Sequence, residues 1–600
     1  MQPADPARAA VISKSALLPA RPERGKDGGW TWGGRLPVEK GRVRFMVLAE
    51  PGHEPAIRLR SPRGDAWMDA KALAQAGRTT TLALGNTAVS GRLYELDGLA
   101  AGDWTLELVD KAAQAPVYVL LEGDPDLELV SYPVHRRHKV GQTQAVVAML
   151  ARSEGEGASV GVAGIEKASL HLTAPDGAGF DLEMFDDGLH EDGRAGDGVF
   201  GARFEVAKAG SWLAQVRVEG RHPDGSGMLR TAEHVIPVVE DRLALGGGVQ
   251  VAKDAADRFV FRLPVVGGKA SRHYRVLAEV WGRDAEGGPL PVAWIGGMSE
   301  IKAGALDLHL DRRWLNRSGA QGPFELRALR IEDPDHFVPL VEVDALALPL
   351  PVHRVKAMPD LAIDEAMRMG PRPQALLEAK GTGSRLLLVH GYCSGVVWPS
   401  SHFTGASTFL DPNKNRSHDA FARLIRDFGA TWNSFGIVAH SQGGAAALHL
   451  YTYYWSGLDN AGPGRLIQSV GTPYQGTNLA GVLAALGGIF GVGCGSNDNL
   501  TYSGAAAWLA GIPSWARAKV NYYTTSFRST YWWRNDYCNF ASDLVLSDPE
   551  DGTVEKVYGQ LSGGVNRGHT SGQCHTTGMR DPAQYLDASR NAVMNSNAAR

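Results

Sequence analysis

One serine stands in a sequence setting that predicts an exposed, reactive hydroxyl. Within residues 436–447, a short apolar run ends at Ser441. Gln442, two glycines and three alanines with high helix propensity follow. This pattern is typical of a strand, a tight turn and a helix, with the serine on the turn. Gly443 supplies a small residue where strand and helix must pass closely, whereas Ala439 stands where glycine is usual. An ordinary strand-to-helix turn is the alternative interpretation.

A nucleophilic serine needs two further side chains, and the C-terminal part of the chain offers candidates for both. A histidine must take the hydroxyl proton, and a carboxylate must hold that imidazole in the right tautomer. A lone histidine is ordinarily a surface or core residue, and an aspartate before glycine is ordinarily a turn former. The candidate bases and acids downstream of the serine are His575, His569, Asp551, Asp548 and Asp543.

The region around the serine alternates between strand-like and helical patterns, as expected of a parallel sheet covered by helices. Residues 385–391 form a continuous apolar run that ends at His390 and Gly391, typical of a strand buried on both faces. Residues 417–428 begin with the N-cap candidate Ser417 and carry apolar residues at helical spacing. The sequence therefore predicts an α/β domain with a mainly parallel sheet over residues 354–600.

Three motifs in this region resemble those of one enzyme family. Residues 388–392 read Leu-Val-His-Gly-Tyr, residues 439–444 read Ala-His-Ser-Gln-Gly-Gly, and residues 470–477 read Val-Gly-Thr-Pro-Tyr-Gln-Gly-Thr. Their order and spacing resemble bacterial lipases of the α/β-hydrolase superfamily, over roughly residues 380–580. The resemblance implies an α/β-hydrolase domain that cleaves carboxylic esters, as a lipase or carboxylesterase does.

The resemblance also implies a role for individual residues. Ser441 would be the nucleophile; Asp551, in a turn that matches the family's Asp-Gly-x-Val pattern, would be the acid; and His575, 24 positions later, would be the base. The oxyanion hole consists of two backbone N–H groups that stabilise charge on the tetrahedral intermediate. The family geometry assigns these donors to Tyr392 and Gln442.

Two further features bear on the substrate, which we expect to be a hydrophobic ester or lipid, or a polymer surface. The apolar, glycine-rich stretch 479–493 lies where lipases carry a mobile lid, and a buried packing helix is the alternative. Several aromatic residues could line an acyl-binding cleft or pack in the core. They are Trp508, Trp515, Tyr522, Tyr523, Tyr531, Trp532 and Trp533.

The residues before the α/β domain show the texture of antiparallel β-structure. Short runs that alternate hydrophobic and polar residues are broken by Gly, Pro and Asp, which predicts sandwiches. We expect three Ig-like β-sandwich modules at residues 35–127, 128–241 and 242–353, after a disordered or extended segment at residues 1–34. No strict repeat links the three modules.

Clustered carboxylates on one glycine-rich loop indicate a candidate structural calcium site. Asp186, Asp192 and Asp197 lie close together in the sequence, and carboxylate oxygens are ligands that calcium prefers. The spacing is not that of an EF-hand, and Asp-Gly pairs are typical of turns, so a solvated acidic loop is the alternative. No cofactor is expected to be required for catalysis. Thr577 replaces the calcium-binding aspartate of the resembled lipases, so that calcium site is not expected.

Composition argues against several function classes. The net charge of −4, with 44% hydrophobic and 21% charged residues, gives no basic surplus for nucleic acid or anionic membranes. No run reaches the roughly 18–20 apolar residues that span a bilayer, so no transmembrane segment is expected. The four cysteines suit two disulfides in an exported protein, or else four buried reduced thiols. They are Cys393, Cys494, Cys538 and Cys574.

We expect a secreted or periplasmic protein, although residues 1–26 as written lack the apolar core of a signal peptide. A disulfide at Cys393 would stiffen the neighbouring oxyanion loop. The cysteine-rich C-terminus also has a looser likeness to secreted proteins labelled conditioned medium factor, which implies signalling. The appended β-modules suggest one rival function, a polyester depolymerase, because such modules often hold a catalytic domain on an insoluble polymer. The likeness suggests another, a non-catalytic secreted binding or signalling protein on a hydrolase scaffold.

Overall fold

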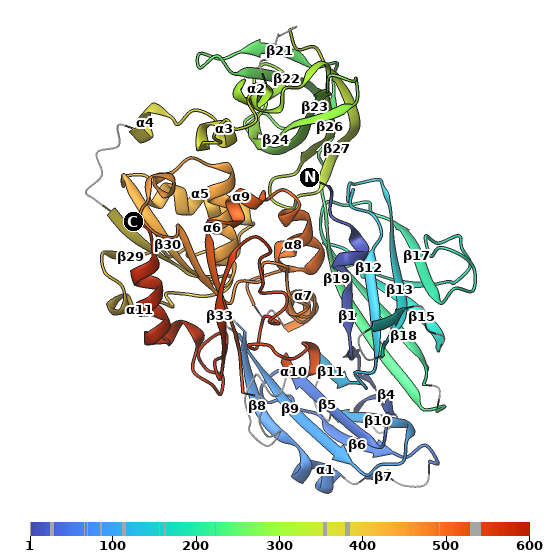
Figure 1. Cartoon of the computed structure of the whole chain (residues 1–600). Helices are drawn as coiled ribbons and strands as arrows, with labels where there is room; N and C mark the ends of the chain where they lie inside the picture. Colours follow the sequence, from blue (N-terminus) through green and yellow to red (C-terminus); the bar gives the residue numbers. More distant parts are fainter. Residues whose placement is uncertain are drawn as a thin grey trace.

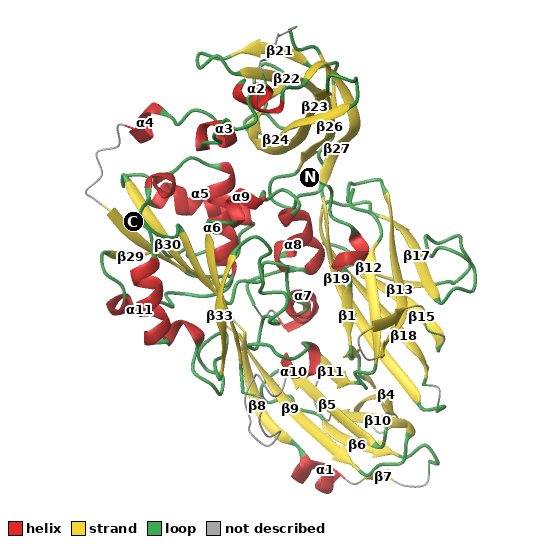
Figure 2. Cartoon of the chain, viewed as in Figure 1, coloured by secondary structure: helices red, strands yellow, loops and turns green. Residues whose placement is uncertain are grey.

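The computed structural model describes residues 2–24, 29–64, 67–68, 70–84, 87–110, 116–154, 157–160, 162, 164–222, 224–351, 357–377, 384–490, 493–528 and 542–600. Figure 1 shows three β-sandwiches around a C-terminal unit, which comprises residues 384–600. Strands dominate the sandwiches, whereas most helices lie in the C-terminal unit (Figure 2). The predicted change from β-structure to mixed α/β structure is therefore present.

The first sandwich packs a sheet of order β3-β4-β10-β6-β7 against a sheet of order β2-β11-β5-β9-β8. All of its strand pairs are antiparallel. Its elements are β2 (Ser15–Ala20), β3 (Glu23–Arg24), β4 (Trp30–Val38), β5 (Arg42–Ala49), β6 (Ala56–Arg60), β7 (Trp67–Met68), α1 (Ala70–Ala76), β8 (Arg78–Leu84), β9 (Thr87–Asp97), β10 (Gly102–Asp110) and β11 (Val117–Glu122).

The second sandwich joins the sheet β1-β12-β13-β14, with β17 also on β13, to the sheet β16-β15-β18-β19. Its elements are η1 (Pro6–Ala9), β1 (Val11–Ser13), β12 (Leu127–Pro133), β13 (Thr143–Glu154), β14 (Gly157–Val160), β15 (Ile165–Thr173), β16 (Gly179–Glu183), β17 (Val199–Glu205), β18 (Gly210–Arg221) and β19 (Gly227–Val238).

The third sandwich joins the sheet β20-β22-β21, with β25 also on β22, to the sheet β24-β23-β26-β27. Its elements are β20 (Ala244–Leu245), β21 (Gln250–Lys253), β22 (Phe259–Val266), β23 (His273–Arg283), β24 (Pro289–Glu300), β25 (Ala305–Leu310), α2 (Arg313–Ser318), β26 (Gln321–Glu332) and β27 (Pro339–Leu348). Two short helices, α3 (Glu365–Met369) and α4 (Gln374–Leu377), follow it.

The N-terminal segment 1–34, expected to be disordered or extended, instead contributes strands to two sandwiches. β1 pairs with β12 in the second sandwich, and β2 pairs with β11 in the first. The reason is the apolar content of residues 15–20: Ala16, Leu17 and Leu18 are all buried. Burial of these side chains stabilises the strand pairing of this segment.

The C-terminal unit is built on a six-stranded sheet of order β29-β28-β30-β31-β32-β33, in which every pair is parallel. β28 (Ser384–Val389) has β29 (Ala406–Thr408) on one side and β30 (Ser434–His440) on the other. The strand order therefore reverses at β28. In open parallel sheets, functional sites lie at the carboxyl ends of the strands at such a reversal. The remaining strands are β31 (Ile467–Val470), β32 (Val520–Ser526) and β33 (Val565–Ser571).

The helix that follows β30 is buried along its length. Its residues from Gln442 to Thr452 are all buried, as expected of a helix that is small and apolar on every side. The helices of the unit are η2 (Ser400–His402), α5 (His418–Phe428), α6 (Gln442–Tyr453), η3 (Gly457–Asn460), α7 (Leu479–Phe490), η4 (Asp498–Leu500), α8 (Tyr502–Leu509), α9 (Ser514–Arg517), α10 (Asp543–Val545), η6 (Gln584–Leu586) and α11 (Ala588–Asn597).

Helix α7 decides between the two interpretations of the stretch 479–493. Leu479, Val482 and Leu486 are buried in one hydrophobic cluster with Met46 and Tyr118 of the first sandwich. α7 is therefore the buried packing helix of the two alternatives, and it holds the first sandwich against the C-terminal unit.

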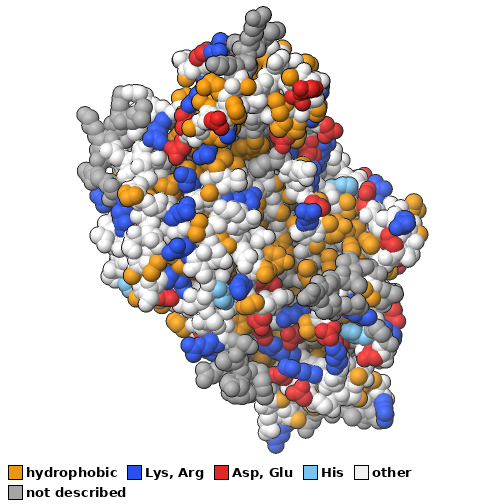
Figure 3. All heavy atoms as spheres, in the orientation of Figure 1, with side chains coloured by type: hydrophobic (Ala, Val, Ile, Leu, Met, Phe, Trp, Pro, Cys, Tyr) orange, Lys and Arg blue, Asp and Glu red, His pale blue; other side chains and the backbone are white. Residues whose placement is uncertain are grey.

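The surface carries both signs of charge. On the face shown in Figure 3, acidic and basic side chains are interspersed, with no single-sign patch. Among the helices of the described residues, none has both the length and the apolar character needed to cross a bilayer.

Candidate active site

Ser441 lies at the sharp turn between β30 and α6. Its backbone has φ 55° and ψ −134°, a conformation that L-residues other than glycine rarely adopt. The Ser441 N–H donates to the Val470 carbonyl at 3.1 Å, and the Thr472 hydroxyl donates to the Ser441 carbonyl at 2.8 Å. A Cβ added at Gly443 would lie 2.4 Å from the His390 carbonyl oxygen, so only glycine fits there. These contacts give the strand, tight turn and helix that the sequence pattern predicts.

The structure brings Ser441, His575 and Asp551 together. His575 Nε2 lies 2.9 Å from Ser441 Oγ, and His575 Nδ1 lies 2.9 Å from Asp551 Oδ2. The other Asp551 oxygen accepts the N–H groups of Thr553 and Val554 at 3.0 and 2.8 Å, which fixes the carboxylate. All three residues are buried, and Ser441 is 7% exposed. This arrangement lets the imidazole remove the serine proton while the carboxylate orients the ring.

The competing candidates lie elsewhere. His569 on β33 contacts the hydroxyls of Thr524 and Ser526 at 3.0 and 3.1 Å. Asp543 forms an ion pair with Arg44 of the first sandwich at 2.5 Å. Neither residue is hydrogen-bonded to His575 among the described contacts. Burial raises the pKa of Asp548, whose environment therefore disfavours the carboxylate form.

The loop after β28 lies directly over Ser441. A Cβ added at Gly391 would lie 2.4 Å from Ser441 Cβ and 2.9 Å from Ser441 Oγ. His390 Nε2 accepts the Asp411 N–H at 2.9 Å, so its proton is on Nδ1, which donates to the Gly391 carbonyl at 2.7 Å. The Ser394 hydroxyl donates to the same carbonyl at 3.0 Å. A trans peptide points its N–H opposite its C=O, so these bonds fix the direction of the Tyr392 N–H.

The Tyr392 loop is tied to residues 494–495 by covalent and polar contacts. Cys393 forms a disulfide with Cys494, as the sequence suggested for this loop. The Tyr392 hydroxyl donates to the Gly495 carbonyl and accepts the Cys494 N–H at 3.1 Å. The only other partner left for Cys574 in a second disulfide is Cys538, which lies outside the described residues.

Gln442, the second predicted oxyanion residue, is the first residue of α6. The first N–H groups of a helix have no intrahelical partner, so the Gln442 N–H is available at the elbow. Its side chain is buried and donates to the Arg416 carbonyl at 2.8 Å, next to His418 Nδ1 at 3.3 Å. Burial lowers the pKa of His418 to about 3, so His418 is neutral and its Nδ1 can accept a hydrogen bond.

Two buried residues behind His575 were missed in the sequence. His440 Nε2 lies 3.0 Å from the His575 carbonyl oxygen, and burial holds the pKa of His440 well below its usual value. The neutral ring therefore donates this hydrogen bond and fixes the His575 backbone. The Gln584 amide lies 3.0 Å from His575 Nδ1, 3.1 Å from His440 Nε2 and 2.6 Å from Thr525 Oγ1. The amide nitrogen faces the two imidazole nitrogens, and the amide oxygen accepts the Thr525 hydroxyl.

A loop of the third sandwich enters the C-terminal unit near α5 and α8. Phe337, between β26 and β27, is 1% exposed and packs with His449 at 5.9 Å in the core of the C-terminal unit. Arg275 of β23 lies over the Phe337 ring at 4.2 Å and donates to the carbonyls of Trp508 and Ala507. The third sandwich and the C-terminal unit therefore share a core.

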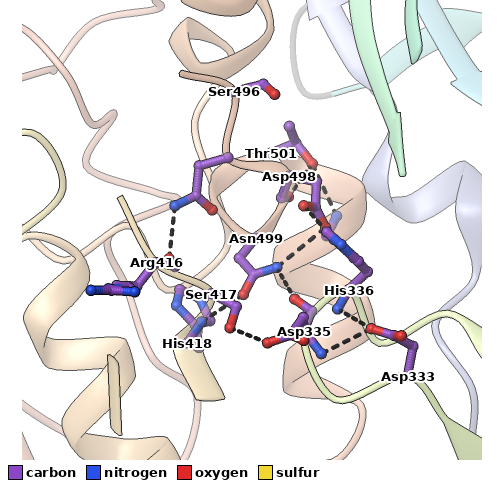
Figure 4. A network of polar contacts seen from close by, with 12 residues as sticks. Asp333, Asp335, His336, Arg416, Ser417, His418, Ser496, Asp498, Asn499 and Thr501 are labelled. Atoms are coloured by element: carbon purple, nitrogen blue, oxygen red, sulfur yellow. Dashed lines mark hydrogen bonds and ion pairs between the residues drawn. The ribbon is translucent and has the colours of Figure 1, made fainter. Parts of the chain in front are cut away.

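Polar contacts link this loop to Ser417 and Asn499 of the C-terminal unit (Figure 4). Asp335 accepts the Ser417 hydroxyl at 2.6 Å, and its carbonyl accepts the Asn499 amide at 2.8 Å. The Asn499 side-chain oxygen in turn accepts the His418 N–H at 2.7 Å. Because the neighbouring Arg416 carbonyl holds the Gln442 side chain, a continuous network runs from Asp335 to the first turn of α6.

In the acidic loop of the second sandwich, the carboxylates accept hydrogen bonds from backbone N–H groups of the same loop. Asp192 accepts the N–H groups of Asp187, Gly188 and His190. Asp186 accepts three backbone N–H groups of residues 196–198, and Asp197 accepts two. These carboxylates order their own loop, which is the role that the turn alternative predicts.

Of the seven aromatic residues considered for an acyl-binding cleft, three pack in the core, one is half-buried and three lie outside the described residues. Trp508 is 0% exposed, and Tyr522 and Tyr523 are also buried, so these three rings pack in the core. Trp515 is half-buried. Tyr531, Trp532 and Trp533 lie outside the described residues.

Four family models match the chain in order. They are described as the conditioned medium factor first, second and third Ig-like domains, at residues 15–124, 127–238 and 275–371, and the conditioned medium factor C-terminal domain, at residues 381–598. The chain therefore matches, in order, models of the four domains that these descriptions name. The prediction of three Ig-like sandwiches before a domain with a parallel sheet is confirmed, and these units are called Ig-like domains and C-terminal domain below.

The chain is similar to a curated relative and to several solved structures. "Conditioned medium factor" of Dictyostelium discoideum is 39% identical over 455 residues, which cover 72% of this chain and 65% of that protein. A DUF4785 family protein of Legionella pneumophila is 12% identical, with 56% and 92% coverage and a TM-score of 0.35. The mature lipase BlEst2 of Bacillus licheniformis is 18% identical, with 32% and 84% coverage and a TM-score of 0.23. Both structural scores are too low to bear on function.

Proposed function

We propose that this chain is a serine hydrolase that cleaves carboxylic esters through an acyl-enzyme on Ser441, in an α/β-hydrolase domain. The observation that supports the proposal best is the pair of 2.9 Å contacts that His575 makes, Nε2 with Ser441 Oγ and Nδ1 with Asp551 Oδ2. The strained turn at Ser441 is a second support, because such backbone strain concentrates at functional sites.

In the proposed reaction, Ser441 Oγ attacks the ester carbonyl carbon as its proton passes to His575 Nε2. The Asp551 carboxylate stabilises the imidazolium that forms. The N–H groups of Tyr392 and Gln442 donate to the oxyanion of the tetrahedral intermediate.

Collapse of the intermediate breaks the ester bond, and His575 gives its proton to the departing alcohol. The acyl group remains on Ser441 Oγ. Water then attacks the acyl carbon with His575 as general base, and the tetrahedral intermediate releases a carboxylic acid and restores the serine.

The comparisons favour a second candidate, a secreted factor that acts by binding a partner and has no turnover. The match with "Conditioned medium factor" supports it, because this name describes a factor of the medium and not an enzyme. The same name and the Cys393–Cys494 disulfide support an extracellular location, since disulfides persist in oxidising compartments. A preserved hydrolase scaffold without turnover is physically possible.

An ester panel separates the candidates. Short- and long-chain p-nitrophenyl esters and a polyester film would be offered to the native chain, to Ser441→Ala and to Ser514→Ala, an exposed serine in α9 that serves as control. The proposal expects turnover by the native chain and by Ser514→Ala, and loss of it in Ser441→Ala. Absence of Ser441-dependent turnover on every ester would favour the secreted factor. Turnover confined to the film would identify a polyester depolymerase.

A further inference from the structure

A cleft of about 350 Å³ lies between the third Ig-like domain and the C-terminal domain. Its walls come from strands β23 to β25 and Arg258 on one side and from α3, α6 and α9 on the other, a junction visible above the parallel sheet in Figure 1. Its volume falls within the range of about 300–1,000 Å³ that is usual for small-molecule sites. Ser441 is not among its lining residues, so the cleft is separate from the proposed active site.

The charges that line the cleft do not balance. Glu300 lies 3.2 Å from His273 and 3.9 Å from Lys302, which also lines the cleft, and Asp307 is paired with Arg262 at 3.7 Å. Arg258 and Arg368 also line the cleft, and within the described part of the chain neither guanidinium has a carboxylate at ion-pair distance. The lining therefore has two uncompensated positive charges and no uncompensated negative one.

Arg258 is the more unusual of the two arginines. It is 6% exposed, and its Nε is buried without a hydrogen-bond partner among the described residues. Burial lowers the pKa of Arg258, against the weaker opposing effect of Asp311 and Asp254, yet an arginine side chain stays charged. A buried charge without a partner costs folding free energy, so its presence at a cleft indicates that a bound anion completes the pair.

Indole rings accompany these charges. Trp294, Trp455 and Trp515 line the cleft and are half-buried, and the Arg368 guanidinium lies 5.4 Å from the Trp515 ring. Half-exposed tryptophans offer a flat apolar face beside polar groups. A pyranose ring has a matching shape, because its C–H face is apolar and its rim carries hydroxyls.

We propose that this cleft binds an anionic sugar, a pyranose that carries a carboxylate, sulfate or phosphate. The acidic group pairs with Arg258 and Arg368, and the ring stacks on the indoles. This site goes beyond the proposed ester hydrolysis and does not depend on it.

Isothermal titration of the full chain with glucuronate, glucose 6-sulfate, glucose 6-phosphate and neutral glucose, at constant ionic strength, tests the proposal. At least one charged sugar is expected to bind about tenfold or more tightly than glucose, which corresponds to one ion pair that survives in a partly dry cleft. Which of the three binds identifies the acidic group. Equal binding of glucose and the charged sugars, or no binding of any, would overturn the proposal.

Variants locate the site. Arg258→Met and Arg368→Met are each expected to weaken binding about tenfold, whereas Arg221→Met in the second Ig-like domain is the control and should bind as the native chain does. Arg258→Met should also keep or raise the melting temperature of the sugar-free chain, because it removes an unpaired buried charge.

A variant that fills the cleft with a bulky side chain tests the site without removing a charge. A Cβ at Gly297 would meet nothing within 4 Å, and Gly297 lines the cleft, so Gly297→Phe is expected to occupy the cleft. Loss of binding in Gly297→Phe supports the site, and binding that persists in Gly297→Phe or in both arginine variants places the sugar elsewhere and overturns it.

Discussion

His336 of the third Ig-like domain forms an ion pair of 2.8 Å with Asp498, the first residue of η4 in the C-terminal domain. The two residues are 162 positions apart in the chain. Burial disfavours the charged imidazole, but Asp498, followed by Asp333 and Asp335, raises the pKa of His336 to about 9. His336 is therefore positively charged at neutral pH and holds the two domains together.

The raised pKa predicts how stability depends on pH. A folded-state pKa of about 9, above the ordinary value of 6.5, gives stability that is fully present below about pH 6.5 and is lost as the pH rises through about 9. The imidazole is 36% exposed, so solvent screening limits the contribution to about 1 kcal/mol. We expect His336→Gln to melt below the native chain at pH 6.5 and together with it at pH 10. The same difference at both values would contradict this account.

Gly391 should be irreplaceable because it lies over the nucleophile. A Cβ at this position would come within 2.9 Å of Ser441 Oγ, in the space where an ester carbonyl must approach. We expect Gly391→Ala to lower kcat/KM by about 100-fold, the usual cost of a displacement of about 1 Å. Gly395→Ala is the matched control in the same loop, because a Cβ at Gly395 meets nothing within 4 Å. Equal activity of the two variants would show that the loop does not contact the reacting atoms.

The Cys393–Cys494 disulfide should support both stability and turnover. It joins cysteines that are 101 positions apart and adjoins Tyr392, whose N–H is a proposed oxyanion donor. Cys393→Ser is expected to reduce the free energy of unfolding of the C-terminal domain by about 2–4 kcal/mol. Turnover by Cys393→Ser should also fall, measured below its melting temperature. If kcat is unchanged there, the disulfide has no part in holding the oxyanion loop.

Gln584 should act as a positioning residue for His575. Gln584→Met keeps the volume of the side chain but removes the amide that lies 3.0 Å from His575 Nδ1 and 3.1 Å from His440 Nε2. We expect kcat to fall about tenfold with KM nearly unchanged, because the ring orientation matters most in the transition state. A purely structural role would instead change kcat and KM together, or lower the melting temperature without changing kcat.

The elbow could be predicted from the sequence because its determinants are local. Ser441, Gly443 and the following alanines define the turn within a few residues, and burial of β30 follows from its continuous apolar run. His575 and Asp551 were predicted through a resemblance, and His575 lies 2.9 Å from both Ser441 Oγ and Asp551 Oδ2 in the structure. Their role as catalytic groups stays a proposal.

The positioning contacts could not be predicted, because they join residues that are distant in sequence. Gln584 meets His440 across 144 positions, and no local pattern marks either residue as a partner of His575. Nothing in the sequence around Phe337 distinguishes it from other loop residues of a sandwich, yet its side chain packs in the core of the C-terminal domain. For the same reason the sequence could not decide between a lid and a packing helix for residues 479–493. The apolar face of α7 contacts Met46 and Tyr118, more than 350 positions earlier.

Covalent labelling tests the central claim most directly. A fluorophosphonate probe phosphonylates a serine only where a neighbouring base activates its hydroxyl. The folded protein is labelled first, then digested and analysed by mass spectrometry. The account predicts a single modified residue, Ser441, and no labelling of Ser441→Ala or His575→Ala. The account would be contradicted if the native chain, shown to be folded by its melting curve, is not labelled, or if labelling persists in Ser441→Ala.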